Sequence, residues 1–335
     1  MHHLFLNHLS YPQQVRIGIA GCGQLTQQVH LPCLIGLSSA AIVAIADTST
    51  QRLNACAVLV PSALRFDSLE DMLTEPKLDA VLVATPTGDH ARHASLVLAA
   101  GKALYLEKPM ASSLSEAEQL LVQAQSCDAL AMMGFNYRFN PLLIHAGKLA
   151  SQAPIQEFKS TFSLAPKQLP GWKTKRQTGG GVLLDLASHH FDLISNHFGF
   201  KVSAVEATIT SDQSEEDTAS VTLYAPTGAM ALCSFSLCSG EVDSFSFRNA
   251  NGSFGFSRYN PWSYPLLPPQ NFIKYHLERY RSPWKEPSFR RSLSAWIQAI
   301  QQHTPPPVSL SDGLEAMRLI DAAERSSVLK RRVLI

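Results

Sequence analysis

The chain has 335 residues, of which 45% are hydrophobic and 16% charged, and its formal net charge is +1. This length predicts two domains, and this composition is typical of a folded globular protein rather than a disordered or fibrous one. The near-neutral charge gives no reason to expect a nucleic acid or an anionic membrane as a partner. No apolar run approaches the roughly 20 residues that a membrane span needs.

The first half of the chain alternates apolar strand patterns with amphipathic helix patterns. Residues 1–11 hold one short apolar cluster and are expected to form a disordered extension. Apolar strands separated by helices indicate a parallel sheet with helices on both faces. The predicted strands cover 15–20, 41–46, 80–84, 103–106 and 130–133, and the predicted helices lie near 25–38, 49–58, 89–100 and 114–126.

After about residue 150 the apolar residues recur with period two, over segments 202–210, 219–225 and 229–237. A Pro-Thr-Gly hairpin turn at 226–228 joins the last two, so we expect an antiparallel sheet. One face should pack on a core, while the other is polar enough to meet solvent or a second subunit. The apolar face is expected to hold Val205, Ala207, Ile209, Val221, Leu223, Cys233, Phe235, Leu237, Phe245 and Phe247.

Two late helices are predicted, over about 288–302 and 311–329. Residues 259–287 are rich in proline and aromatic residues and are interpreted as a loop or lid. The whole pattern predicts an α/β protein with two domains. A doubly wound dinucleotide-binding (Rossmann) domain covers residues 12–135. A C-terminal α/β domain with an open, largely antiparallel sheet covers residues 136–335 and serves substrate binding and oligomerisation.

The six cysteines show neither a CxxC spacing nor a disulfide framework. Cys233 and Cys238 are the closest pair, but an odd offset along one strand puts them on opposite faces. This argues against a shared metal, and no metal site is expected. Reduced, mostly buried thiols are typical of a cytoplasmic protein.

A glycine turn, Gly21-Cys22-Gly23, follows the first predicted strand and opens the first predicted helix. In a dinucleotide-binding fingerprint the first glycine permits the tight turn, and the second lets backbone N–H groups reach the pyrophosphate. Thr26 stands at the third glycine position, which serves packing between helix and strand. The helix start at Gln24 and Leu25 belongs to the same predicted phosphate site.

Asp47 ends the second predicted strand and is placed to accept hydrogen bonds from the adenosine ribose hydroxyls. Its charge would repel a 2′-phosphate, so NAD is the expected cofactor. Arg52 lies close in sequence and leaves NADP open as an alternative. Another interpretation is that Asp47 only caps the following helix.

Four further motifs occur in a fixed order: ATPTGDH at 84–90, YLEKP at 105–109, GFNYRF at 134–139 and GGGVLLDLASHH at 179–190. In this order and spacing the sequence resembles the glucose–fructose oxidoreductase and inositol dehydrogenase (Gfo/Idh/MocA) family. The resemblance runs from about residue 15 to the C-terminus and is weakest over 240–290. It implies that Lys108, Asp185 and His189 form the catalytic centre of an NAD(P)-dependent dehydrogenase or reductase.

The residues themselves agree with these roles. Lys108 follows a parallel strand at its carboxyl end, where ligands bind in open α/β sheets, and could stabilise a developing alkoxide. His189 suits the base that takes the hydroxyl proton of a secondary alcohol. Asp185 lies four residues earlier on one predicted helix, so both side chains share a face and Asp185 could position the substrate or hold the imidazole tautomer.

Each residue also has a simpler interpretation. Lys108 could be a solvated surface charge, Asp185 could complement a helix dipole, and His189 could be a satisfied core residue. All three residues occur together, with a predicted cofactor turn upstream in the sequence, and this favours the active-site interpretation over the simpler ones.

The resemblance also implies that Thr85, Pro86 and His90 line the nicotinamide side and that Glu107 contacts the ribose. Trp172 is similar to the tryptophan of a Trp-Arg pair that some members place near the cofactor, but lysine stands second here. The loop 165–180 carries several cations and no acid, so it could meet a phosphate or a nucleotide sugar, but a solvated loop is the favoured interpretation. Those cations are Lys167, Lys173, Lys175 and Arg176.

The expected reaction is hydride transfer between nicotinamide and a secondary alcohol or ketone of a sugar, cyclitol or nucleotide sugar. A homodimer or homotetramer formed through the open sheet is expected, since members of the family often associate there. The alternative is a non-catalytic NAD(P) or sugar sensor on the same fold, because a fold does not fix a function. The joint presence of Lys108, Asp185 and His189 opposes that alternative.

Overall fold

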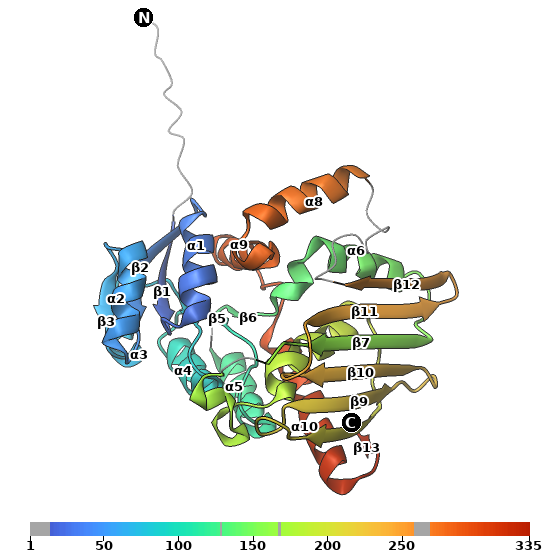
Figure 1. The fold of residues 1–335 in the computed structure, drawn as a ribbon. Helices are drawn as coiled ribbons and strands as arrows, with labels where there is room; N and C mark the ends of the chain where they lie inside the picture. Colours follow the sequence, from blue (N-terminus) through green and yellow to red (C-terminus); the bar gives the residue numbers. More distant parts are fainter. Residues whose placement is uncertain (1–13, 128, 167–168, 258–268) are drawn as a thin grey trace, which may run out of the picture.

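The first sheet of the molecule has six parallel strands in the order β3-β2-β1-β4-β5-β6 (Figure 1). The computed structural model describes residues 14–127, 129–166, 169–257 and 269–335, so the extension predicted for residues 1–11 lies outside the described residues. The order reverses between β1 and β4, which is the arrangement of a doubly wound sheet and confirms the predicted fold class. The strands are β1 (Val15–Ala20), β2 (Ala40–Ala46), β3 (Leu64–Phe66), β4 (Ala80–Val83), β5 (Ala103–Leu106) and β6 (Ala131–Met133).

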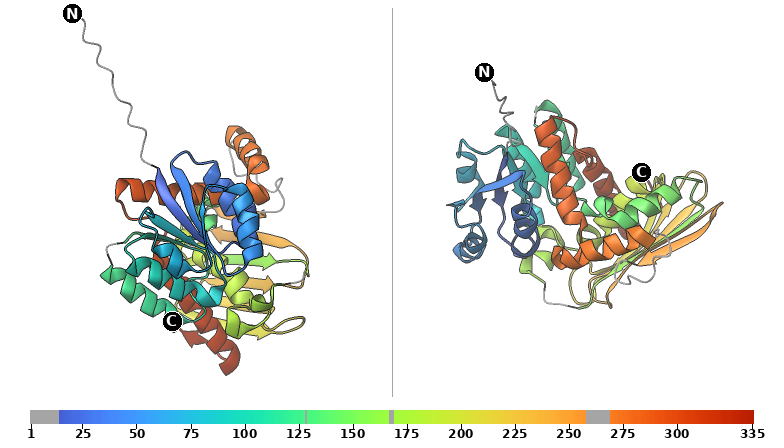
Figure 2. Two further views of the ribbon diagram at one scale, coloured as in Figure 1. Left: turned by 90° about the vertical axis from the view of Figure 1, so that its left-hand side faces the viewer. Right: turned by 90° about the horizontal axis from the view of Figure 1, so that it is seen from above.

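Helices cover both faces of this sheet (Figure 2). Serine side chains cap three of them, at Ser49, Ser68 and Ser113, because each hydroxyl accepts a hydrogen bond from an amide of the first turn. The sequence did not predict β3 and α3, which span only three and five residues. The segments are η1 (a π-helix, Thr26–His30), α1 (Leu31–Ile35), α2 (Thr50–Leu59), α3 (Leu69–Leu73), α4 (Thr87–Ala99) and α5 (Leu114–Ser126).

The second sheet has seven strands in the order β12-β11-β7-β10-β9-β8-β13. It is antiparallel except where β10 pairs in parallel with β7, a central strand that the sequence did not predict. The three predicted strands are confirmed to within two residues at each end. The strands are β7 (Glu157–Ser163), β8 (Ala204–Thr210), β9 (Thr218–Tyr224), β10 (Met230–Ser236), β11 (Val242–Asn249), β12 (Gly252–Ser257) and β13 (Val333–Leu334).

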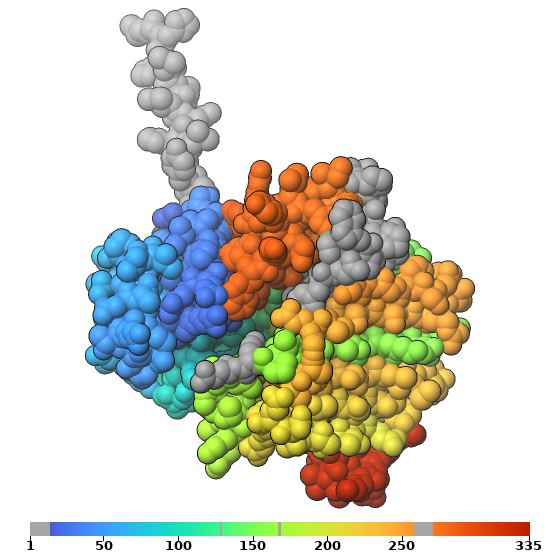
Figure 3. Space-filling model, in the orientation of Figure 1, coloured from blue at the N-terminus to red at the C-terminus, as the bar shows by residue number. Residues whose placement is uncertain are grey.

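The two faces of the second sheet differ as predicted. Its inner face is apolar, and of the ten residues predicted for it only Ile209 is not fully buried. Its outer face carries Thr208, Thr222 and Tyr224 together with exposed Met230 and Leu232. Figure 3 looks onto this outer face, where the strand surfaces are seen directly and no described helix lies over them.

The prediction of a loop or lid over 259–287 is wrong for its second half, which contains the helix α8 (Pro269–Arg281). Lys274, Glu278 and Arg281 of this helix lie at i, i+4 and i+7 and share one face. Ile273 and Leu277 are exposed, so the helix does not bury a broad apolar stripe as a core helix does. Among the described side chains of α8, that of Tyr275 is buried. Residues 258–268 lie outside the described residues.

The last two long helices pack against the first sheet and its helices, and the second of them also reaches the second sheet. The helix α9 (Ser288–Gln302) packs against α1 and β1, and α10 (Leu310–Leu329) packs on β8 while also contacting α5 and β6. Both confirm the predicted late helices, and Figure 3 shows the orange surface of α8 and α9 lying against the blue N-terminal half. The remaining segments are α6 (Pro141–Ala150), α7 (Ser188–Asp192), the π-helices η5 (Leu183–Ala187) and η6 (Leu193–His197), and the 3-10 turns η2 (Asn136–Phe139), η3 (Gly171–Lys173), η4 (Arg176–Thr178) and η7 (Pro283–Lys285).

None of the helices described is both long and apolar enough to cross a membrane.

Candidate active site

The glycine turn after β1 has the shape that a pyrophosphate requires. Gly21 adopts φ +97°, and a Cβ there would lie 2.4 Å from the carbonyl oxygen of Ala84, so no other residue fits without rearrangement. A Cβ on Gly23 would meet nothing within 4 Å, so the space above the turn is open. Thr26 is fully buried and donates its hydroxyl hydrogen to the Gly21 carbonyl, which holds the turn in place of a third glycine. The residues present therefore fit a dinucleotide.

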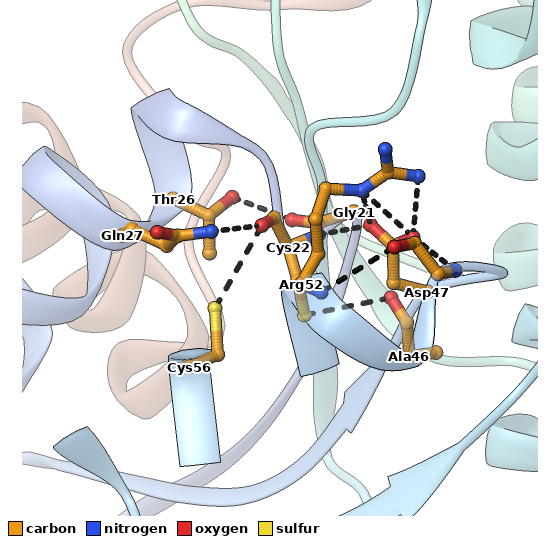
Figure 4. A network of polar contacts seen from close by, with 9 residues as sticks. Gly21, Cys22, Thr26, Gln27, Ala46, Asp47, Arg52 and Cys56 are labelled. Carbon is orange, nitrogen blue, oxygen red and sulfur yellow. Dashed lines mark hydrogen bonds and ion pairs between the residues drawn. The ribbon is translucent and has the colours of Figure 1, made fainter. Parts of the chain in front are cut away.

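Asp47 follows β2 and is tied to the glycine turn (Figure 4). Its carboxylate accepts the backbone N–H of Cys22 at 2.8 Å and that of Ser49 at 2.8 Å. Arg52 approaches from α2 with Nη2 2.7 Å and Nε 3.0 Å from Asp47 Oδ1. Burial raises the pKa of the Asp47 carboxyl, but the hydrogen bonds from Arg52, Ser49 and Cys22 outweigh it and hold the pKa below its ordinary value.

This geometry bears on the two interpretations of Asp47. Ser49 provides the N-cap of α2, since its hydroxyl accepts from the Arg52 amide, so Asp47 is not the capping residue. The contact of Asp47 with ribose hydroxyls stays a prediction. Arg52 places a cation beside it, half-exposed, which is the residue type that a 2′-phosphate would need.

The segment after β4 is held by two histidines of α4. Thr85 Oγ1 lies 2.9 Å from His93 Nδ1. His90 is buried with Nε2 2.8 Å from the Thr85 carbonyl oxygen and Nδ1 2.6 Å from the Pro109 carbonyl oxygen. Burial lowers the pKa of His90, and these two carbonyls oppose that effect. His90 therefore fixes the ends of β4 and β5 to each other rather than pointing into solvent, and Pro86 directly precedes α4.

Lys108 follows β5, at the same edge of the sheet as the glycine turn. Its Nζ donates to the backbone carbonyl of Asp185 at 2.6 Å and lies 3.5 Å from Asp185 Oδ1. Lys173 reaches the same carboxylate from η3, with Nζ 2.8 Å from both oxygens. The structure thus brings two of the three predicted catalytic residues into contact and adds a second lysine.

Burial lowers the pKa of Lys108, and the nearby charge of Lys173 lowers it further. The carboxylates of Asp185 and Glu107 act in the opposite direction. The net result is an ammonium that is easier to deprotonate than a surface lysine. A group of this kind at a strand end can donate a hydrogen bond to an oxygen that gains charge.

His189 lies in α7, directly after the π-helix that carries Asp185. Its ring stacks on the ring of Tyr137, with centroids 4.4 Å apart and planes 10° apart, and meets Phe135 edge-on. The predicted single α-helix over Asp185 and His189 is therefore a π-turn followed by an α-turn. The shared face expected for these two side chains stays a prediction.

Glu107, expected to contact the ribose, is buried and faces His30 at the end of η1. Glu107 Oε1 lies 3.0 Å from His30 Nε2, and both side chains are almost fully enclosed. The pair links the helix behind the phosphate turn to the residue before Lys108. The ribose contact stays a prediction.

The loop that carries Trp172 makes more ion pairs with the rest of the protein than a solvated loop would. Lys173 lies 5.3 Å from the ring centroid of Trp172 and pairs with Asp185. Arg176 Nε lies 2.6 Å from Glu324 Oε1 in α10. Lys175 is exposed, and Lys167 lies outside the described residues.

Sequence reasoning missed the role of Lys173 and of the Asn-Tyr-Arg-Phe turn at 136–139. Asn136 donates to Ser288, Tyr137 donates to Asp243, and Arg138 pairs with Asp192. Burial raises the pKa of Asp192, while Arg138 opposes it. An aspartate three residues after His189 was visible in the sequence, but its partner in the turn was not, because only the fold brings the two segments together.

A doubly wound sheet with this glycine turn, an acid after β2 and a largely enclosed lysine after β5 defines an NAD(P)-dependent oxidoreductase. Two family models match the chain. An oxidoreductase family with an NAD-binding Rossmann fold matches residues 15–135, and the GFO/IDH/MocA C-terminal domain matches residues 153–254. The chain belongs to the GFO/IDH/MocA family of oxidoreductases, as its motifs predict.

Several relatives match over nearly the whole chain. Inositol 2-dehydrogenase of Rhizobium meliloti (strain 1021) is 27% identical, covering 96% of this chain and 99% of its own length. The dTDP-3,4-didehydro-2,6-dideoxy-alpha-D-glucose 3-reductase of Actinomadura kijaniata is 23% identical, covering 92% and 94%. The crystal structure of GenD2 from gentamicin A biosynthesis, in complex with NAD, is similar in fold with a TM-score of 0.83, 20% identity and coverage of 96% and 97%.

Proposed function

We propose that the protein catalyses reversible hydride transfer at a secondary alcohol or ketone of a sugar, cyclitol or nucleotide sugar. The observation that carries this proposal is the Lys108 ammonium, largely enclosed after β5 and held by Asp185 at the edge where the glycine turn also lies. A relative named as an inositol dehydrogenase and one named as a nucleotide-sugar reductase support this substrate class.

The chain's own residues would divide the work as follows. The turn at Gly21–Gly23 and Asp47 would hold the dinucleotide, whose nicotinamide accepts or returns the hydride when bound. His189 would take the hydroxyl proton of the alcohol, or return it to the ketone oxygen in the reverse direction. Lys108 would donate a hydrogen bond to that same oxygen and stabilise its partial negative charge.

Asp185 would act on Lys108 rather than on the substrate directly. Its backbone carbonyl and its carboxylate both face the ammonium, and they limit the directions in which Nζ can point. Lys173 would satisfy both oxygens of the Asp185 carboxylate. The Lys108 ammonium would then keep N–H hydrogens that it can donate to the substrate. We assign residues 12–135 to the cofactor and residues 136–335 to the substrate and to assembly.

A substrate screen tests the function. Purified protein with NAD or NADP is offered sugars, cyclitols and nucleotide sugars, as alcohols and as ketones, while reduced nicotinamide is followed by absorbance. Turnover of at least one such compound is expected. A protein that binds the dinucleotide but turns over none of them would support the sensor alternative.

The cofactor preference provides a second prediction. We expect NAD(H) to bind more tightly than NADP(H), because Asp47 would repel a 2′-phosphate. Asp47→Ser should narrow that difference, and Arg52→Gln should widen it by removing the adjacent cation. Calorimetric titration of the wild type and both variants with each dinucleotide measures these affinities. Tighter binding of NADP(H) by the unmodified protein would contradict the assignment.

Assembly provides a third prediction. The outer face of the second sheet leaves Leu232 41% and Met230 43% exposed among polar residues, and we expect a second subunit to cover it. Light scattering at micromolar concentration should therefore report a dimer or tetramer. Leu232→Glu should shift it toward monomer, whereas Val122→Glu, on exposed α5, should not. A monomeric wild type would refute this prediction.

A further inference from the structure

The candidate base His189 rests on a tyrosine that is itself fixed to a buried acid. The ring of Tyr137 lies parallel to the imidazole at 4.4 Å, and the hydroxyl of Tyr137 donates to Asp243 Oδ2 at 3.0 Å. Tyr137 is in the turn η2, whereas Asp243 is in β11, about a hundred residues later in the chain. The contact therefore joins the second sheet to the candidate active site.

Asp243 occupies an unusual place for a carboxylate. It is fully buried on the inner face of β11, in register with Phe162 and two residues before Phe245. A charge in such a place is stable only when hydrogen-bond donors surround it. Tyr137 is one donor, and His190 Nε2 lies 3.4 Å from the other carboxylate oxygen.

His190 completes the arrangement. Its Nδ1 is hydrogen-bonded to the Ser160 hydroxyl, and its ring is enclosed by Phe162, Phe235 and Phe245. The hydrogen bond between Ser160 and Nδ1 allows either atom to be the donor. In the tautomer with Ser160 as donor, the imidazole proton lies on Nε2 and faces Asp243 Oδ1.

We propose that Tyr137 and Asp243 are positioning residues that orient the imidazole of His189 and stabilise its protonated form. The inference rests on the proposed function, in which His189 takes and returns a proton. A phenol that donates a hydrogen bond to a carboxylate has a more electron-rich ring. An imidazolium stacked on that ring is attracted to its π face, and this attraction is absent for the neutral imidazole.

The arrangement matters because His189 changes charge during the reaction. Stabilising the imidazolium makes His189 a stronger base when it accepts the hydroxyl proton. The same elements carry other charged or titratable groups, and a test must separate their effects. These groups are Asp185, His190 and Asp192 around His189 in the chain, Arg138 in η2, Lys108 after β5 and Asp243 in β11.

The test compares variants that remove one part at a time. Tyr137→Phe keeps the stacked ring and removes the hydroxyl, Asp243→Asn removes the charge, and Tyr137→Leu removes the ring. Ser288→Ala is the matched control. Ser288 lies in α9 and accepts a hydrogen bond from Asn136 of the same turn, so this variant loosens the turn without changing Tyr137 or Asp243. Near-ultraviolet circular dichroism checks that each variant is folded.

The main readout is the titration of His189, followed by NMR in protein labelled with carbon-13 histidine. The signal is assigned by its loss in His189→Ala, and no substrate is required. Tyr137→Leu should lower the proton affinity of His189 about three- to tenfold, the scale of a cation–π contact. Tyr137→Phe and Asp243→Asn should each lower it by a smaller factor, because the stacked ring stays in place. Ser288→Ala should leave it unchanged.

Activity gives the second readout. On a substrate found by the screen, kcat at neutral pH should fall by a similar factor in Tyr137→Phe and Asp243→Asn and more in Tyr137→Leu. The affinity for NAD should be unchanged in all three, since in the proposed function the dinucleotide is held by Gly21–Gly23 and Asp47.

An unchanged His189 titration in both Tyr137→Phe and Asp243→Asn would overturn the proposal, and so would an equal shift in Ser288→Ala. If the titration shifts as expected but no substrate is found, the positioning role stands and the proposed function fails.

Discussion

Replacing Lys108 with methionine is expected to lower kcat by about a hundredfold or more, the scale for losing one preorganised donor. Methionine keeps most of the side-chain length and removes the charge, so packing after β5 should change little. The loss should fall on kcat rather than on the affinity for NAD, because the oxygen that Lys108 contacts gains its charge only in the transition state.

A matched control lies at the other end of the same strand. Lys102 precedes β5 and donates to the Leu78 carbonyl at 2.8 Å, away from the edge that carries Lys108. Lys102→Met should therefore leave kcat close to that of the wild type. Equal losses in both variants would indicate general damage to the sheet, and full turnover by Lys108→Met would overturn the catalytic assignment.

The pH dependence of kcat gives an independent check on Lys108. Burial lowers its pKa, so the ammonium should lose its proton at a pH below the ordinary lysine value of about 10.4. Because the charged form is the useful donor, kcat should fall as the pH rises through that lowered pKa. Removing Lys173 should move this alkaline limb to higher pH, since a like charge then no longer opposes the ammonium.

The parts of the site that the sequence predicts are those set by local order along the chain. The glycine turn, Asp47 and Lys108 each directly follow an apolar strand, and parallel strands bring their carboxyl ends to one edge. The sequence alone therefore predicts that the glycine turn, Asp47 and Lys108 lie near one another. The strand β7 could not be predicted in this way, because Ser160 interrupts its buried face between Phe158 and Phe162.

The partners of the site are set by contacts between distant segments, which a pattern of residues does not reveal. The sequence places Lys173 in a solvated loop, yet Lys173 binds Asp185, because the fold brings η3 next to η5. Asp243 did carry a signal, since it stands on the apolar face two residues before Phe245. A carboxylate at such a position indicates a buried partner, although the sequence does not say which one.

Replacing His189 with alanine is expected to lower kcat by about 10² to 10⁴, the range for losing a general acid or base. It should also flatten the pH profile near neutrality, where an imidazole changes charge. His303→Ala, on an exposed residue at the end of α9, is the control and should do neither.

The double variant Lys108→Met/His189→Ala separates cooperation from independent action. Both residues would act on the same oxygen, one through its proton and the other through its charge, so losing either one already disables that step. The combined loss should therefore be smaller than the product of the two single losses. Calorimetry should find NAD affinity nearly unchanged in all three variants, because the phosphates would rest on Gly21–Gly23. If the losses multiply, the two side chains serve separate steps, and a single centre built from Lys108 and His189 is wrong.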